Sequence, residues 1–127
     1  MGVADMKAIV CATRDDADRV VAAIDAARCP DGTEEAVRYV RGREVARERR
    51  PAKRWAEPVE LEDGRVAVPW KDERLDAIAG REVTVRGERL RVPRVQDMSE
   101  IEIATDDAGD PVTREDGTLV LRERRLS

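Results

Sequence analysis

The side chain best suited to nucleophilic chemistry in this sequence is the thiol of Cys11, near the end of the apolar run 6–12. A predicted helix begins three residues later, and a helix N-terminus lowers the pKa of a nearby thiol. A phosphatase-like loop would also need an arginine six residues after the cysteine, where this chain has Ala17. The first turn of the predicted helix instead carries Asp15, Asp16 and Asp18, whose carboxylates would repel an anionic substrate. We therefore predict that Cys11 is a buried structural residue.

Other catalytic and metal-binding arrangements lack the residues that they need. The chain has no histidine, which excludes Ser-His-Asp and Cys-His catalysis and most transition-metal sites. The acidic segment 106–110 lacks the alternating ligands and the closing glutamate of a calcium loop, so we interpret it as a solvated turn. Cys11 and Cys29 flank a predicted helix about 20 Å long, too far apart for a disulfide. The sequence thus predicts a non-enzymatic protein with no catalytic residue, cofactor or metal site and with two free thiols.

One segment has a strongly unbalanced charge. Between residues 38 and 54 the chain carries eight basic residues and two acidic ones. The basic residues are Arg38, Arg41, Arg43, Arg47, Arg49, Arg50, Lys53 and Arg54, and the aromatic residues Tyr39 and Trp55 lie beside them. This pattern favours a solvated or protein-facing basic surface. Two alternatives stay open: a surface that follows a phosphate backbone and stacks on bases, and an arm that orders only on binding.

Trp55 and Trp70 are two of the three aromatic residues in the chain, and both fall in the predicted hairpin 55–70. Their rings either form a small cluster within that hairpin or leave one ring exposed at an interface, where tryptophan is enriched. Both tryptophans, together with Tyr39 and the eight basic residues, are our candidates for contact with a partner.

The hydrophobic periodicity predicts an α+β fold. An apolar strand at 6–12 precedes a helix at 14–28 that Thr13 caps, and this strand–helix opening packs on a mostly antiparallel sheet. Alternation predicts hairpins at 55–70 and 83–92 and a strand at 100–103. A short helical segment is expected at 72–79, and the tail 122–127 is expected to fray.

The region between the first helix and the first hairpin is ambiguous. Thr33 is able to start a second helix, which Gly42 would interrupt, and the segment is otherwise a strand or a disordered arm. We predict an α+β domain over residues 1–80, with residues 33–54 as an Arg-rich insertion. Residues 81–127 form a β-rich extension or part of the same domain.

The composition indicates a small hydrophobic core. Large aliphatic residues occupy 27 of 127 positions, there is no phenylalanine, and 41% of the residues are charged. Such a chain gains stability from a partner or from copies of itself. No run of 18 apolar residues and no signal-peptide pattern occurs in the sequence. We therefore expect neither a membrane span nor secretion by a signal peptide.

A motif in the first hairpin resembles a known family. The residues are Arg54-Trp55-Ala56-Glu57-Pro58, then Asp63-Gly64-Arg65, then Ala67-Val68-Pro69. This pattern, and the strand and alanine-rich helix over residues 9–27, is similar to small, mostly uncharacterised proteins of tailed bacteriophages. The resemblance covers residues 6–29 and 53–70. It implies a virion-associated or tail-region accessory component and transfers no catalytic motif, whereas the Arg-rich insertion and the β-rich C-terminal half depart from that pattern.

We therefore expect a non-enzymatic structural protein of a phage particle, in the tail, baseplate or neck, that acts through protein–protein contacts. Exposed strand edges would pair between copies, while the tryptophan hairpin and the Arg-rich segment dock a neighbouring protein. The partners would be other virion proteins or copies of itself, located in the virion or the host cytoplasm. The alternative is a phage-encoded inhibitor of a host defence or replication protein. A third hypothesis is a nucleic-acid accessory protein that uses the Arg-rich segment.

Overall fold

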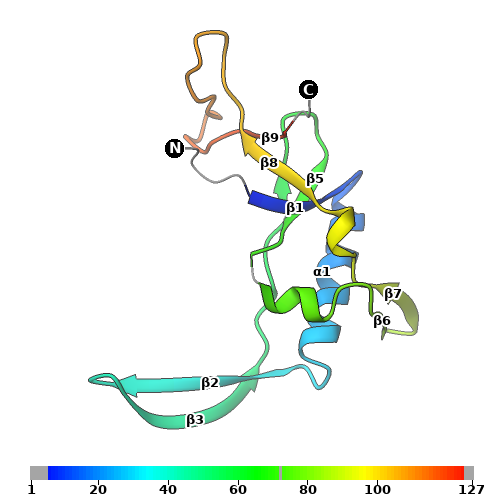
Figure 1. Cartoon of the computed structure of the whole chain (residues 1–127), viewed down its shortest axis with the longest axis vertical. Helices are drawn as coiled ribbons and strands as arrows, with labels where there is room; N and C mark the ends of the chain where they lie inside the picture. Colours follow the sequence, from blue (N-terminus) through cyan, green and yellow to red (C-terminus); the bar gives the residue numbers. More distant parts are fainter. Residues whose placement is uncertain (1–5, 72, 125–127) are drawn as a thin grey trace.

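A computed structural model of the chain describes residues 6–71 and 73–124 (Figure 1) and confirms the α+β fold class. The first elements are β1 (Met6–Cys11), α1 (Arg14–Arg28), β2 (Thr33–Val40), β3 (Arg43–Pro51), β4 (Val59–Glu60) and β5 (Val66–Pro69). They are followed by the 3-10 turn η1 (Glu73–Ala77), β6 (Glu82–Val85), β7 (Glu88–Arg91), the turn η2 (Val95–Asp97), β8 (Ser99–Ile103) and β9 (Leu121–Glu123).

The strand–helix opening forms as predicted. Thr13 has an extended backbone and its side-chain oxygen accepts a hydrogen bond from Asp16 N at 3.1 Å, which satisfies one of the free donors at the start of α1. At the other end, Cys29 N donates to Asp25 O at 2.8 Å. The helix buries one face, which consists of Ala17, Val21, Ala23, Ile24 and Ala27.

Five strands form the main sheet, in the order β4-β5-β1-β8-β9, and every neighbouring pair is antiparallel. β1 lies at the centre, where Cys11 pairs with Val66 of β5 and Lys7 pairs with Glu100 of β8. Strands from both halves of the chain therefore belong to one sheet.

The sheet curls until its two edges meet. Leu61, directly after β4, forms a bridge with Leu121 of β9, and Glu62 N donates to Leu121 O at 2.8 Å. Inside the curl lies a small apolar cluster of Ala8, Leu61, Ala67 and Ile101. The strands that cross its centre contribute Ala8 and Ala67, both fully buried, because larger side chains would hold the sheet open.

The outer face of the sheet packs against α1. Ile9, Val66 and Val68 lie on this face, in one cluster with Val21 and Ile24 of the helix. The β6–β7 hairpin covers the helix from another side and adds Val83 and Leu90 to the cluster, while Trp70, Leu75 and Val92 complete it.

Most of the predicted local elements are present. The hairpin at 83–92 is formed by β6 and β7, the strand at 100–103 by β8, and the helical segment at 72–79 is the 3-10 turn η1, with Asp72 outside the described residues. The hairpin at 55–70 is shorter than predicted, because only Val59 and Glu60 pair with β5. In the tail, residues 121–123 form β9 rather than fraying, and residues 125–127 lie outside the description.

Of the alternatives that the sequence leaves open for residues 33–54, a helix, a strand or a disordered arm, the structure has strands. Residues 33–51 form the long β2–β3 hairpin, whose turn places Arg41 at φ 52° and Gly42 at φ 77°. Two consecutive residues with positive φ match the twist of antiparallel strands in a two-residue loop, so Gly42 completes the turn before β3 begins at Arg43.

Both cysteines are free, as predicted, and the predicted burial of Cys11 is confirmed, while Cys29 is also buried. Burial raises the pKa of the Cys11 thiol, and the nearby Asp16 carboxylate raises it further. The environment of Cys11 therefore favours the protonated thiol over the reactive thiolate.

The curled sheet can be tested by filling its interior. We expect Ala67→Leu to lower the free energy of unfolding by about 1–3 kcal/mol, because the extra methyl groups have no space between the strands. Urea denaturation measures the change. The matched control is Ala46→Leu on the exposed strand β3, for which we expect a change within about 0.5 kcal/mol. Equal stability of Ala67→Leu and the wild type would contradict the tight curl.

Candidate functional site

The β2–β3 hairpin, residues 33–51, is the most unusual surface of the protein, and we call it the hairpin arm. Figure 1 shows that it extends away from the sheet and α1. Every residue from 38 to 51 is exposed, and the small sheet that contains the arm consists of β2 and β3 alone in the described part of the chain. The arm therefore has two unpaired edges and no buried face along its outer half.

Ion pairs across the two strands hold the base of the arm together. Glu34 and Arg50 are direct partners in the ladder, with Nε of Arg50 at 3.2 Å from a carboxylate oxygen of Glu34. Arg47 pairs with Glu35 of the opposite strand and with Glu44 of its own, and Arg49 pairs with Asp31 at 3.2 Å. Three of the predicted basic candidates thus engage carboxylates of the same chain.

The far end of the arm, residues 38–45, has a different character, and we call it the tip. Its arginines are Arg38, Arg41 and Arg43, and none of them forms an ion pair within residues 6–71 and 73–124. Beside them lie three exposed apolar residues, Tyr39 at 63%, Val40 at 48% and Val45 at 51% exposure. Val45 is the extra residue where the register shifts between Arg38 and Tyr39. The tip is therefore a basic surface with an apolar centre.

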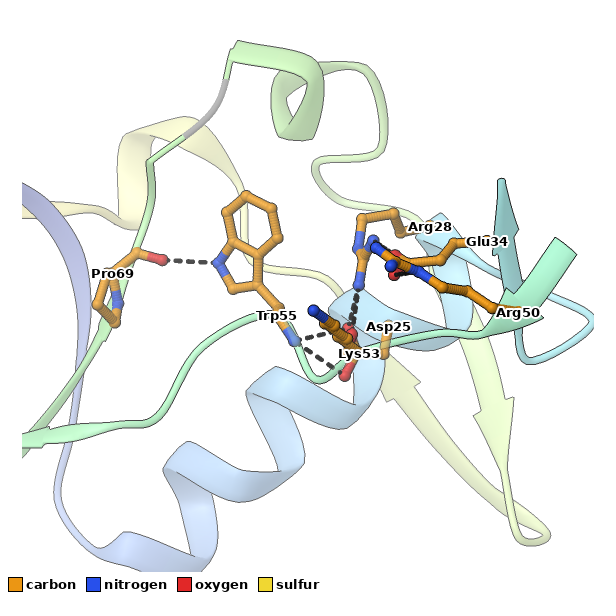
Figure 2. Close-up of polar contacts among 7 residues, drawn as sticks. All are labelled: Asp25, Arg28, Glu34, Arg50, Lys53, Trp55 and Pro69. Carbon is orange, nitrogen blue, oxygen red and sulfur yellow. Dashed lines mark hydrogen bonds and ion pairs between the residues drawn. The ribbon is translucent and has the colours of Figure 1, made fainter. Parts of the chain in front are cut away.

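The arm is attached to the body through Arg28 in the last turn of α1 (Figure 2). Its Nη2 donates to Asp25 Oδ1 and to the Lys53 carbonyl, each at 2.9 Å, and its Nη1 donates to Glu34 at 3.4 Å. The guanidinium also lies over the ring of Trp55, 5.6 Å from the centroid. One side chain thus connects α1 to the beginning of β2 and to the segment that follows β3, at the base of the arm.

Trp55 takes part in the same junction. Its backbone N–H donates to Asp25 at 3.1 Å, and its Nε1 donates to the Pro69 carbonyl at 2.8 Å, as Figure 2 shows. Trp70 lies deeper, at 7% exposure, and its Nε1 donates to Asp76 at 2.9 Å. Trp70 is therefore a core residue and not a surface for a partner, and Trp55 is a half-buried residue of the arm's junction.

The last two basic candidates lie at the base of the arm rather than at the tip. Arg54 pairs with Asp18 of α1 and with Glu57, the latter at 2.9 Å. Lys53 contributes its carbonyl to the junction. The segment from 38 to 54 is therefore not one continuous basic surface, because Arg47, Arg49, Arg50 and Arg54 hold carboxylates, whereas the arginines of the tip form no ion pair among the described residues.

Between the end of α1, the base of the arm and η1 lies a cleft of about 620 Å³. Large apolar side chains and charged side chains line it together. They are Trp55, Leu75 and Ile78, and Arg28, Glu34, Glu35, Arg49, Arg50 and Arg74. Arg28 and Arg50 both pair with Glu34, although the Nε–H of Arg28 is buried without an acceptor among the described residues. Arg28, Glu34 and Arg50 thus contact each other and hold the base of the arm, rather than pointing free into the cleft.

The described residues contain no group of three or more His, Cys, Asp or Glu side chains placed to hold a metal ion. No helix within these residues is long and apolar enough to span a membrane. Neither the protein-family models nor the curated proteins nor the solved structures contain a match to this chain.

Sequence reasoning named the arginines of the tip but missed the arm that presents them and the junction of Asp25, Arg28 and Glu34. One signal was available. The segment Val40-Arg41-Gly42 repeats as Val85-Arg86-Gly87, which was correctly predicted as a hairpin turn. No comparable signal connects Arg28 to Glu34 and Lys53, because their contacts depend on the fold.

The junction predicts a pH dependence that Glu34 controls. Burial alone would raise the pKa of Glu34, but hydrogen bonds from the Lys53 backbone, Arg28 and Arg50 outweigh it and hold the pKa below its usual value. A lowered pKa means that the carboxylate stabilises the fold above the usual glutamate range near about 4.3, and that this contribution disappears as the pH falls through the lowered value.

We therefore expect Glu34→Gln to lower the melting temperature at pH 7, and the difference from the wild type to shrink on acidification below the usual glutamate range. Thermal unfolding followed by circular dichroism between pH 7 and acid measures both effects. Glu48→Gln is the control, because Glu48 is an exposed carboxylate on β3 for which no ion pair is observed among the described residues. A difference that stays constant with pH would contradict the assignment to Glu34.

Proposed function

We propose that this chain is a non-enzymatic assembly protein of a tailed-bacteriophage particle, in the tail, baseplate or neck, and that it acts by placing the hairpin arm in contact with another protein. The observation that carries the proposal is the exposure of the arm from residue 38 to residue 51. The resemblance of residues 6–29 and 53–70 to small phage proteins supports a phage particle as the location of this chain.

The energetics of the arm support a role in binding. An isolated two-stranded hairpin is at best marginally stable in water, because it has no apolar face to bury. The ion pairs of Arg47, Arg49 and Arg50 are exposed and contribute little each. An arm of this length therefore gains most of its possible stabilisation from a second protein, through its free strand edges or its tip.

The arm also offers the strand edges that assembly between proteins requires. In the main sheet, Leu61 and Leu121 bring the two outer strands together, which leaves less edge for another chain. The outer edges of β2 and β3 run along eight and nine residues. The strand pairing expected from the sequence thus has its best site on the arm rather than on the main sheet.

The residue types at the tip fit the centre of a protein–protein interface. Tyrosine and arginine are enriched among the residues that dominate binding energy, and the tip combines Tyr39 with three arginines. The base of the arm is poorly suited to binding a phosphate backbone, because its arginines Arg47, Arg49 and Arg50 already form ion pairs with carboxylates.

Shortening the arm tests the proposal. Residues 37–47 are replaced by Asn-Gly, which joins the ladder partners Ala36 and Glu48 through a two-residue turn and keeps the junction intact. We expect an almost unchanged melting temperature and a loss of about tenfold or more in the amount incorporated into particles. Quantitative mass spectrometry of density-purified particles measures the copy number relative to the major capsid or tail protein.

The control for this experiment is Arg89→Ala, an exposed position on the β6–β7 hairpin, which leaves the arm unchanged. A whole-number copy ratio for the wild type and the control, together with loss of the shortened variant, would support the proposal. Absence of the wild-type chain from particles, with the chain bound to a host protein in infected cells, would instead favour the inhibitor hypothesis. Incorporation of the shortened variant at the wild-type level would remove the arm from the mechanism.

A further inference from the structure

The two ends of the molecule carry opposite charge. At one end lies the tip, with Arg38, Arg41 and Arg43. At the other end of the long axis lies the excursion between β8 and β9, residues 104–120, which we call the acidic loops (Figure 1). The acidic loops contain five carboxylates and one basic residue: Asp106, Asp107, Asp110, Glu115, Asp116 and Arg114.

Local hydrogen bonds shape the acidic loops and leave much of their charge exposed. The Asp106 carboxylate accepts hydrogen bonds from Ala108 N and Asp110 N, both at 2.9 Å, and Asp116 accepts from Thr118 in the next turn. These carboxylates organise the turns. The side chains of Asp107, Asp110 and Glu115 are exposed, and in the described part of the chain no hydrogen bond to their carboxylates is observed.

The single basic residue of the acidic loops offsets only a small part of their charge, through its attraction to Asp116. Arg114 donates to the Glu60 carbonyl at 2.9 Å and to the Leu119 carbonyl at 3.5 Å, so its guanidinium is engaged with backbone beside the main sheet. The carboxylates of both turns remain exposed. The acidic loops therefore present a net negative surface to any protein that approaches this end.

Apolar exposure is also concentrated at these two ends. Among the described residues, five large hydrophobic side chains are exposed, and three of them (Tyr39, Val40 and Val45) belong to the tip. A fourth, Leu119 at 41% exposure, belongs to the acidic loops. Each end thus combines charge of one sign with an apolar contact, which is the composition of an interface with a polar rim.

We propose that the tip of one copy binds the acidic loops of a second copy, head to tail. The inference rests on the proposed function and names the partner of the arm. It follows from charge complementarity, because three arginines that form no ion pair within residues 6–71 and 73–124 lie at one end of the chain and five carboxylates lie at the other. Since the two surfaces differ, a bound pair of copies leaves one tip and one set of acidic loops free, and the assembly closes into a ring or grows as a filament.

Charge reversal on each surface separately tests the contact. The tip variant is Arg38→Glu, Arg41→Asp and Arg43→Glu, with aspartate at position 41 because it tolerates the positive φ there. The loop variant is Asp107→Lys, Asp110→Lys and Glu115→Lys, which spares the two carboxylates that organise the turns. Sedimentation velocity of the full chain, at about 0.05 M and about 0.5 M NaCl, measures self-association.

We expect the wild type to associate at low salt and to dissociate as salt rises. Each variant alone brings like charges together, so its association weakens by about tenfold or more. An equal mixture of the two variants restores association, because each tip then meets loops of opposite charge.

The matched control is Arg81→Glu, Arg86→Asp and Arg89→Glu on the β6–β7 hairpin, which has the same change in net charge and the same position in an Arg-Gly turn. We expect this variant to associate as strongly as the wild type.

Three results would overturn the contact between copies. They are a wild type that stays monomeric at low salt, single variants that associate as strongly as the wild type, and a control that loses association to the same degree as the tip variant. None of these decides the proposed function, because incorporation of the shortened arm into particles is measured independently. A monomeric wild type whose arm is still required in particles would assign the arm to a different virion protein.

Discussion

The packing of α1 is the constraint on which the other elements depend. Val21 and Ile24 are buried almost completely, between the outer face of the main sheet on one side and the β6–β7 hairpin on another. The chain has few large apolar residues, so one helix has to supply the common surface for several elements. Large apolar residues are also few on the inner face of the sheet. There the sheet curls tightly around the small side chains of Ala8 and Ala67, which brings its edges together.

The same helix determines where the arm points. Its last turn holds Asp25 and Arg28, which bind the backbone at Trp55 and Lys53 and the side chain of Glu34. These contacts fix the arm at its base, next to a buried core, while nothing in the described residues supports the tip. The arrangement combines a defined direction with an exposed end, and this combination suits a contact made outside the molecule's own core.

How much of this could be predicted depends on the range of the interactions. The strand–helix opening, the β6–β7 hairpin and β8 follow from local periodicity, a threonine cap and turn residues, all of which the sequence displays directly. The arm was missed because its strands carry little alternation of apolar and polar residues, having no face to bury. The junction at Arg28 was beyond prediction, since its acceptors lie six residues away at Glu34 and 25 away at Lys53. Trp70 could not be placed from its type alone, because core and interface both favour tryptophan.

Charge illustrates why position in space matters more than position in sequence. Counted along the chain, residues 38–54 form a basic run, which suggested nucleic acid as one possible partner. In the fold, the strand pairing of β2 with β3 brings Glu34 and Glu35 beside that run, and four of its eight basic residues hold carboxylates at the base. What remains is a basic tip far from the acidic loops. The small net charge of −4 thus conceals two separated surfaces of opposite sign, the tip and the acidic loops, and such a separation favours ordered contact between ends over nonspecific attraction.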